Sequence, residues 1–221
     1  MTDQLGDLLR FLQRNGFKLV ILEGPRGAGK TTCCERLLAS SDLLYYKTWG
    51  SEQKWIRDDM QRKLNLDLPQ GTYFVLDFIK QAKSVLKRPI LADRGNLSAI
   101  AYQRELPYGQ NTELRKYYVQ LMRDSEAVLL YLSAPVDVLI SRRVGRKEED
   151  EQKLHTASAG LVRRTIEHDV RLYESSLDLM VKSGLEDVDE FDLNGTTCTC
   201  FVPTDTKLVE EEDQVDEDEV T

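Results

Sequence analysis

The stretch "GPRGAGKTT" at residues 24–32 constrains the fold of this chain more than any other feature. It follows the apolar run "KLVILE" and matches the spacing G-x-x-x-x-G-K-[ST]. A short apolar run rich in branched residues is typical of a strand buried on both faces of a parallel sheet. A strand, a glycine-rich loop and a helix in this order predict a loop that cradles nucleotide phosphates.

The residue types in this loop suit that chemistry. Glycines let the backbone turn its N–H groups toward one anion, and the N-terminus of the following helix adds positive potential. Lys30 is predicted to reach the outer phosphates, and the Thr31 hydroxyl is suited to ligate Mg²⁺. We therefore expect ATP as a phosphoryl donor, with Mg²⁺. The residues predicted to hold the donor are Gly24, Pro25, Arg26, Gly27, Ala28, Gly29, Lys30, Thr31 and Thr32.

The remainder of the chain alternates between strand and helix patterns. Short apolar runs at 43–49, 89–93 and 127–134 predict buried strands, and a long helical pattern follows at about 158–183. "EFDLNG", from residue 190, is a candidate last strand. Strands that alternate with helices predict an α/β domain whose parallel sheet has helices on both faces.

The two ends of the chain are predicted to differ from this domain. Residues 1–17 predict a helix docked on a domain that spans 18–200. Residues 210–221 hold eight acids and no base, which accounts for the whole net charge of −8. Such a segment buries too little apolar surface to offset its ordering entropy. We therefore expect 201–221 to be an acidic, disordered tail, and nonspecific adhesion to nucleic acid to be disfavoured.

No stretch approaches the roughly 18 to 20 consecutive apolar residues of a membrane span, and "MTDQLGDLLRFLQRNG" lacks the apolar region of a signal peptide. These patterns predict a cytoplasmic protein with no membrane partner. The four cysteines include no C-x-x-C pair. Cys33 and Cys34 are expected to be small buried hydrophobes in the helix after the loop.

A second motif, "ADRGNLSAIAYQ", begins where the strand "PILAD" is predicted to end. Asp93 and Arg94 would then lie at the carboxyl edge of the sheet, where open α/β sheets bind ligands. An Asp there can hold the water shell of a metal or accept a proton, and an Arg can grip a phosphate with its bidentate fork. The alternative is a surface ion pair at the start of a helix.

Together the two motifs resemble the thymidylate kinase family. The pattern D-R-[YF]-x-x-S-x-x-A-Y-Q aligns without a gap at Asp93, Arg94, Ser98, Ala101, Tyr102 and Gln103. The resemblance extends through "LLYLSAPVDVLISRRVGRKEEDE" and "TIEHDVRLYE", and so covers roughly residues 18–195. It implies a single P-loop kinase domain with a five-stranded parallel sheet, in which the strand bearing Asp93 adjoins the strand before the loop. It also implies a lid near 142–152 and, since the family is often dimeric, a homodimer.

The resemblance also implies roles for individual residues. Asp93, with Thr31, would organise Mg²⁺, and Arg94 would hold the acceptor. The residues implied to bind the acceptor are Phe74, Arg94, Ser98, Tyr102 and Gln103. Those implied in catalysis are Lys30, Asp93, Arg94 and Arg146. Arg26, which departs from the family, is expected to favour a phosphate near the sugar or to contribute to catalysis from within the loop. Arg142 and Arg143 share the lid-like stretch with Arg146, and the alternative for this pair is a solvated helix face.

Three departures from the family fall on the acceptor side. Arg26 stands where an acid usually contacts the sugar 3'-hydroxyl, and a cation cannot accept that hydrogen bond. Gly95 replaces an aromatic residue, which we interpret as leaving more room at the acceptor site. The stretch "TYFVLDFIKQAK" that contains Phe74 has no arginine for the base.

Three hypotheses follow. The leading one is an ATP-dependent phosphotransferase that moves the γ-phosphoryl group to a pyrimidine deoxynucleotide. The alternative within the same fold is the related phage activity that phosphorylates the hydroxymethyl group of 5-hydroxymethyluracil within DNA. The third is a non-kinase switch that only binds ATP, which the acceptor-side motif disfavours.

Overall fold

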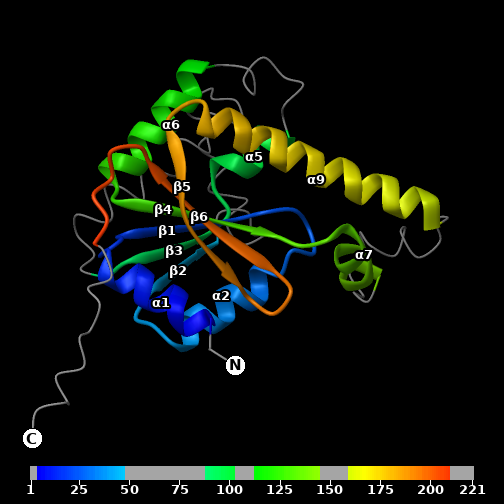
Figure 1. Cartoon of the computed structure of the whole chain (residues 1–221), viewed down its shortest axis with the longest axis horizontal. Helices are drawn as coiled ribbons and strands as arrows, with labels where there is room; N and C mark the ends of the chain where they lie inside the picture. Colours follow the sequence, from blue (N-terminus) through cyan, green and yellow to red (C-terminus); the bar gives the residue numbers. More distant parts are fainter. Residues whose placement is uncertain (1–3, 48–87, 103–111, 145–158, 210–221) are drawn as a thin grey trace, which may run out of the picture.

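Six strands form one sheet in the computed structural model, which describes residues 4–47, 88–102, 112–144 and 159–209 (Figure 1). The sheet order is β2-β3-β1-β4-β6-β5. The strands are β1 (Leu19–Glu23), β2 (Leu44–Lys47), β3 (Ile90–Asp93), β4 (Ala127–Ser133), β5 (Leu185–Asp192) and β6 (Thr197–Pro203). β2, β3, β1 and β4 pair in parallel, whereas β6 is antiparallel to both β4 and β5. Five strands therefore share one direction and β6 runs against them.

The predicted α/β class and the adjacency of β1 and β3 are confirmed, but the expected five-stranded, fully parallel sheet is corrected. The extra strand is β6, "TCTCFVP", whose burial alternates along its first half. Small thiol and hydroxyl side chains alternate there, so the segment lacks the branched apolar run that marks β1 and β4. The boundary predicted at residue 200 falls inside this strand.

Helices cover both faces of the sheet (Figure 1). α1 (Gln4–Arg14) and α2 (Lys30–Ala39) lie on one face. α5 (Asn96–Tyr102), α6 (Thr112–Asp124) and α9 (Ala159–Val181) lie on the other. α7 (Val136–Val144) follows β4 and contacts α9.

The strand before the phosphate loop shows why the core has two halves. Every residue of β1 is buried. Leu19 and Ile21 belong to the cluster under α5, α6 and α9, whereas Val20 and Leu22 belong to the cluster over α1 and α2. Because successive strand side chains point to opposite faces, one continuous apolar run serves both clusters. Burial of each such side chain contributes about 1.5–3 kcal/mol.

The N-terminal helix packs on this core. Leu5, Leu8, Phe11 and Leu12 of α1 are buried, and the Phe11 ring lies 5.8 Å from that of Phe191 in β5. After β6 the chain returns to the end of α1, where the Val209 amide donates to Asn15 Oδ1 at 2.7 Å. The acidic segment 210–221 lies outside the described residues. None of the described helices is long and apolar enough to cross a membrane.

Candidate active site

The phosphate loop connects β1 to α2, and it needs glycine for two reasons, its backbone conformation and its close contact with β4. Gly24, Gly27 and Gly29 have φ angles of 137°, 87° and 94°, a region that L side chains rarely adopt. A Cβ atom on Gly24 would also lie 2.2 Å from the carbonyl oxygen of Leu132 in β4. The loop therefore needs glycine both for its turn and for its direct contact with the end of β4.

Lys30 begins α2 and lies against the loop. Its Nζ donates to the carbonyl oxygens of Gly24 at 2.6 Å and Pro25 at 2.8 Å, and the residue is only 7% exposed. The neighbouring Thr31 and Thr32, which carry hydroxyl groups, are exposed, and Arg26 in the loop is exposed as well. The loop thus combines a fixed ammonium group with hydroxyls that face outward from the first turn of α2.

Two arginines of α7 contact this loop from the other side. Arg142 Nη1 donates to Thr196 Oγ1 at 2.8 Å and to the Gly27 carbonyl at 3.4 Å. Arg143 is buried, and its Nη1 pairs with Asp169 Oδ2 of α9 at 3.1 Å. The alternative that both arginines form a solvated helix face is wrong, because each is anchored to the body of the domain.

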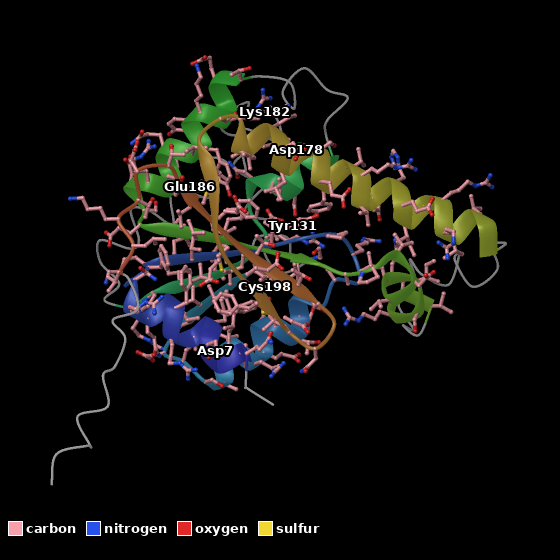
Figure 2. The ribbon with its side chains drawn as sticks, viewed as in Figure 1. Asp7, Tyr131, Asp178, Lys182, Glu186 and Cys198 are labelled. Carbon is pink, nitrogen blue, oxygen red and sulfur yellow. The ribbon has the colours of Figure 1, made fainter. Side chains whose placement is uncertain are left out.

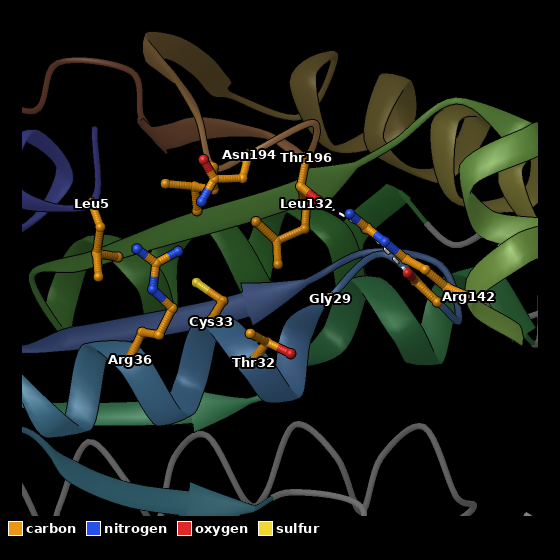
Figure 3. A pocket seen from close by; sticks show the side chains of 11 residues that line it. Leu5, Gly29, Thr32, Cys33, Arg36, Leu132, Arg142, Asn194 and Thr196 are labelled. Carbon is orange, nitrogen blue, oxygen red and sulfur yellow. Dashed lines mark hydrogen bonds between the residues drawn. The ribbon is translucent and has the colours of Figure 1, made fainter. Parts of the chain in front are cut away.

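A cavity of about 370 Å³ opens beside the loop, between α2 and the turn that joins β5 to β6 (Figure 3). Its walls include aliphatic side chains and the backbone of the loop, and two guanidinium groups stand at its rim. The lining residues are Leu5, Gly27, Gly29, Thr32, Cys33, Arg36, Leu132, Arg142, Leu193, Asn194 and Thr196. This mixture of apolar walls with a few polar groups is typical of a small-molecule site.

Asp93 and Arg94 lie at the carboxyl edge of the sheet, as predicted. Asp93 ends β3, next to Leu22 of β1, and its Oδ2 accepts a hydrogen bond of 3.1 Å from Tyr45 Oη of β2. The Arg94 amide continues the ladder by donating to the Leu22 carbonyl at 2.9 Å. Arg94 itself has a φ of 76°, and such strained non-glycine backbone is concentrated at functional sites.

Sequence reasoning missed Glu23, the last residue of β1. It is fully buried, and its Oε1 accepts hydrogen bonds from the amides of Gly95 at 2.7 Å and Ser98 at 3.0 Å. Its Oε2 accepts from Ser98 Oγ. Desolvation raises the pKa of Glu23, although the Ser98 and Arg94 contacts oppose the rise. The available signal was a carboxylate in a fully buried strand, since such a group must find donors.

Ser98 and Tyr173 fix the Arg94 guanidinium. Arg94 Nη1 donates to Tyr173 Oη at 2.7 Å and to Ser98 Oγ at 3.1 Å, and the two hydroxyls lie 2.7 Å apart. Ser98 and Tyr173 are both fully buried. In this structure Ser98 therefore does not line an open acceptor pocket, and it contacts Arg94 and Glu23 instead.

The interpretation that Gly95 leaves room at the acceptor site is wrong. A Cβ atom on Gly95 would lie 2.8 Å from Ile21 Cγ2, because this residue faces the core. Its small size permits close approach of α5 to β1. Phe74, Gln103 and Arg146 lie outside the described residues, and only the backbone of Tyr102 is described.

The oxygen atoms of side chains near the loop suit a magnesium ion that is also bound by water and phosphates, rather than a metal ion bound by protein side chains alone. Within the described ranges, no group of three or more His, Cys, Asp or Glu side chains is arranged to hold a metal. Mg²⁺ is usually held by one or two side chains together with water and substrate phosphates. The Thr31 hydroxyl and the Asp93 carboxylate match that donor set. The two groups come from neighbouring elements, since α2, which begins at Lys30, contacts β3, which ends at Asp93.

The fold and the loop define a P-loop kinase-type α/β domain. A family model described as an AAA domain, AAA_33, matches residues 19–167, and this chain belongs to that family. The match does not distinguish thymidylate kinases, so that resemblance stays a prediction. None of the curated proteins matches the sequence.

Three solved structures are similar over most of the chain. The YorR protein of Bacillus subtilis, in complex with phosphorylated GDP, is 17% identical over 72% of this chain and 79% of its own, with a TM-score of 0.46. The tunicamycin resistance protein of Deinococcus radiodurans is 13% identical over 76% and 96%, with a TM-score of 0.38. Shikimate kinase from Acinetobacter baumannii, in complex with shikimate, is 19% identical over 77% and 96%, with a TM-score of 0.32. Similarity at this level carries no information about the acceptor.

Proposed function

We propose that this protein is an ATP-dependent, Mg²⁺-requiring phosphotransferase whose acceptor is a pyrimidine deoxynucleotide. The observation that carries the proposal is the adjacency of two sets of groups. The phosphate loop follows β1, Asp93 ends the neighbouring β3, and the amide of the next residue, Arg94, donates to the Leu22 carbonyl of β1. Groups suited to a donor and groups suited to an acceptor therefore meet at one edge of the sheet.

The donor would bind on the loop side. Its phosphate oxygens would accept hydrogen bonds from the backbone amides of the loop. Lys30 would then donate to phosphate oxygens in place of the Gly24 and Pro25 carbonyls. The cavity lined by Leu132, Arg142 and Thr196 is continuous with the loop and suits the nucleoside. Mg²⁺, when bound by Thr31 and Asp93, would neutralise charge on the outer phosphates.

The acceptor would bind on the Arg94 side. An oxygen of the acceptor phosphate attacks the γ-phosphorus, the bond from the γ-phosphorus to the bridging oxygen breaks, and ADP leaves with that electron pair. Arg94 would hold the acceptor phosphate with its fork, and Asp93 would orient the attacking oxygen. Catalysis is then positioning together with stabilisation of charge by groups that are already fixed.

Arg26 favours a second candidate, phosphorylation of the hydroxymethyl group of 5-hydroxymethyluracil in DNA. This cation is exposed on the loop, where it suits a phosphate next to the sugar rather than a free 3'-hydroxyl. A DNA acceptor supplies such a phosphate. Gly95 gives this candidate no support, because the core fills the space around it.

The two candidates are separated by their acceptors. The protein is incubated with γ-labelled ATP and Mg²⁺, with thymidylate in one tube and DNA that contains 5-hydroxymethyluracil in another. Our proposal predicts label on thymidylate. Label on the DNA alone would favour the second candidate, and label in neither tube despite ATP binding would favour a switch.

A further inference from the structure

The helix α9 passes over α5 and reaches α7, so it touches both sides of the candidate site (Figure 1). Two of its side chains, Asp169 and Tyr173, bind arginines of the candidate site. Asp169 pairs with Arg143, and Tyr173 accepts from Arg94. They are four residues apart, which places them on one face and within about one turn of an α-helix.

Asp169 acts on the loop side. Its carboxylate holds the Arg143 guanidinium at 3.1 Å, and the Arg143 side chain is only 5% exposed. The Cγ atom of Arg143 lies 3.1 Å from the position that a Cβ atom on Gly27 would occupy, so this side chain packs directly on the loop. A movement of Asp169 would therefore be transmitted to Gly27 through one arginine, because close-packed side chains transmit strain.

Tyr173 acts on the acceptor side. Its hydroxyl contacts Arg94 and Ser98, each at 2.7 Å, and Ser98 in turn donates to Glu23 at the end of β1. The hydrogen bonds that link Tyr173, Arg94, Ser98 and Glu23 are buried or partly buried. Tyr173 itself has no exposed surface. Arg94 therefore takes its orientation from α9 as well as from its own strand.

We infer that the turn of α9 from Asp169 to Tyr173 couples the phosphate loop to Arg94, with both residues acting as positioning residues. A helical turn is rigid, so the two arginines it holds do not move independently. The inference rests on the proposed function, since it joins the side that would bind the donor to the side that would bind the acceptor. It adds that occupation of one side changes affinity on the other, which by linkage is reciprocal.

A double-mutant cycle on nucleotide affinity tests the coupling. The dissociation constant of ADP with Mg²⁺ is measured by calorimetry for wild type, Asp169→Asn, Tyr173→Phe and the double variant. The Tyr173 hydroxyl contacts Arg94 and Ser98 on the acceptor side, and Tyr173→Phe is expected to weaken ADP binding on the loop side by about threefold to tenfold. In the Asp169→Asn background the same change is expected to have less than half of that effect on a logarithmic scale.

Two control variants match the chemistry of the changes. Tyr131→Phe also removes a buried phenol hydroxyl, one without a hydrogen-bond partner in the described part of the chain. Asp178→Asn removes a carboxylate from the exposed side of the same helix (Figure 2). Both should leave the ADP affinity unchanged. If Tyr173→Phe behaves like Tyr131→Phe while wild type binds ADP, the coupling is refuted and the proposed function stands.

A measurement without nucleotide tests the coupling independently of the proposed function. The Nε–Hε signal of Arg94, assigned with Arg94→Lys, is recorded by ¹⁵N NMR. Asp169→Asn is expected to shift it, although Asp169 does not contact Arg94, whereas Asp178→Asn leaves it in place. Absence of ADP binding in wild type would contradict the proposed function, and an unmoved Arg94 signal in Asp169→Asn would overturn the coupling.

Discussion

Lys30 and Glu23 are buried charged residues on either side of the phosphate loop, and their surroundings differ. Lys30 contacts carbonyl oxygens of the loop itself, so its partners are groups that phosphates can replace. Glu23 accepts hydrogen bonds from Gly95, just before α5, and from Ser98 within it, and so fixes the start of α5 against β1. One residue is therefore suited to ligand chemistry and the other to holding the acceptor side in shape.

Lys30→Ala is predicted to lower phosphoryl transfer by about a hundredfold or more, since it removes a charge aimed at the transferred group. The melting temperature should change little, because the hydrogen bonds that the Lys30 ammonium group donates to Gly24 and Pro25 lie within the loop and tie no other element to it. Labelled-ATP assays and thermal scans measure the two effects, with the exposed Lys18→Ala as control. Normal turnover in Lys30→Ala would remove the loop from the mechanism.

Glu23→Gln is predicted to change how stability depends on pH. Burial raises the pKa of Glu23 above its ordinary 4.5, so the folded chain binds more protons than the unfolded chain above that pH. The contribution of Glu23 to the free energy of unfolding is therefore fully present below about pH 4.5 and is lost as pH rises through the raised pKa. Urea unfolding across this range should show a smaller decline in the variant. Identical profiles would argue that the carboxylate is not desolvated.

At the scale of elements, the loop and its flanking strands are packed too closely to accept side chains. Gly24 touches β4, Gly95 touches Ile21 of β1, and Arg143 of α7 touches Gly27. The site is thus assembled from elements whose backbones approach one another directly. The outer strand β5 differs, since exposed acids such as Glu186, Asp187 and Glu190 disfavour pairing at the sheet edge.

Gly24→Ala is predicted to lower the free energy of unfolding by about 3 kcal/mol, because it combines an unfavourable φ with overpacking against Leu132. Gly160→Ala in α9 is the matched control. Its Cβ would meet open space, so it should stabilise the chain by up to about 1 kcal/mol. Denaturant titration of both variants checks the pair, and equal small effects would contradict the close contact with β4.

These contacts also explain how far the sequence could predict the structure. β1, β3 and β4 are continuous apolar runs. The order of strand, loop and helix predicted the place of Lys30, and the end of the run "PILAD" predicted the place of Asp93. β6 was missed because its first half alternates threonine with the buried Cys198 and Cys200 and so lacks a continuous apolar run. The roles of Ser98 and Gly95 depend on Tyr173 and Ile21, which are distant in sequence, and no local pattern records those partners.

At the scale of the whole molecule, the sheet brings two ligand sides to one edge, and α9 spans both. The side proposed for the donor combines the loop with the cavity near Arg142, and the side proposed for the acceptor is built around Asp93 and Arg94. The helix α9 supports the loop side through Asp169 and the Arg94 side through Tyr173. A phosphotransferase needs such an arrangement, because its two substrates must react with each other at a site from which water is excluded.

Transfer of label from γ-labelled ATP, with and without thymidylate, tests this account most directly, with Arg94→Gln as the matched variant. The account predicts labelled thymidylate from wild type and about a hundredfold less from Arg94→Gln. That variant should still bind ADP, with an affinity within about tenfold of wild type. Label released only as inorganic phosphate, at the same rate with and without thymidylate, would contradict it.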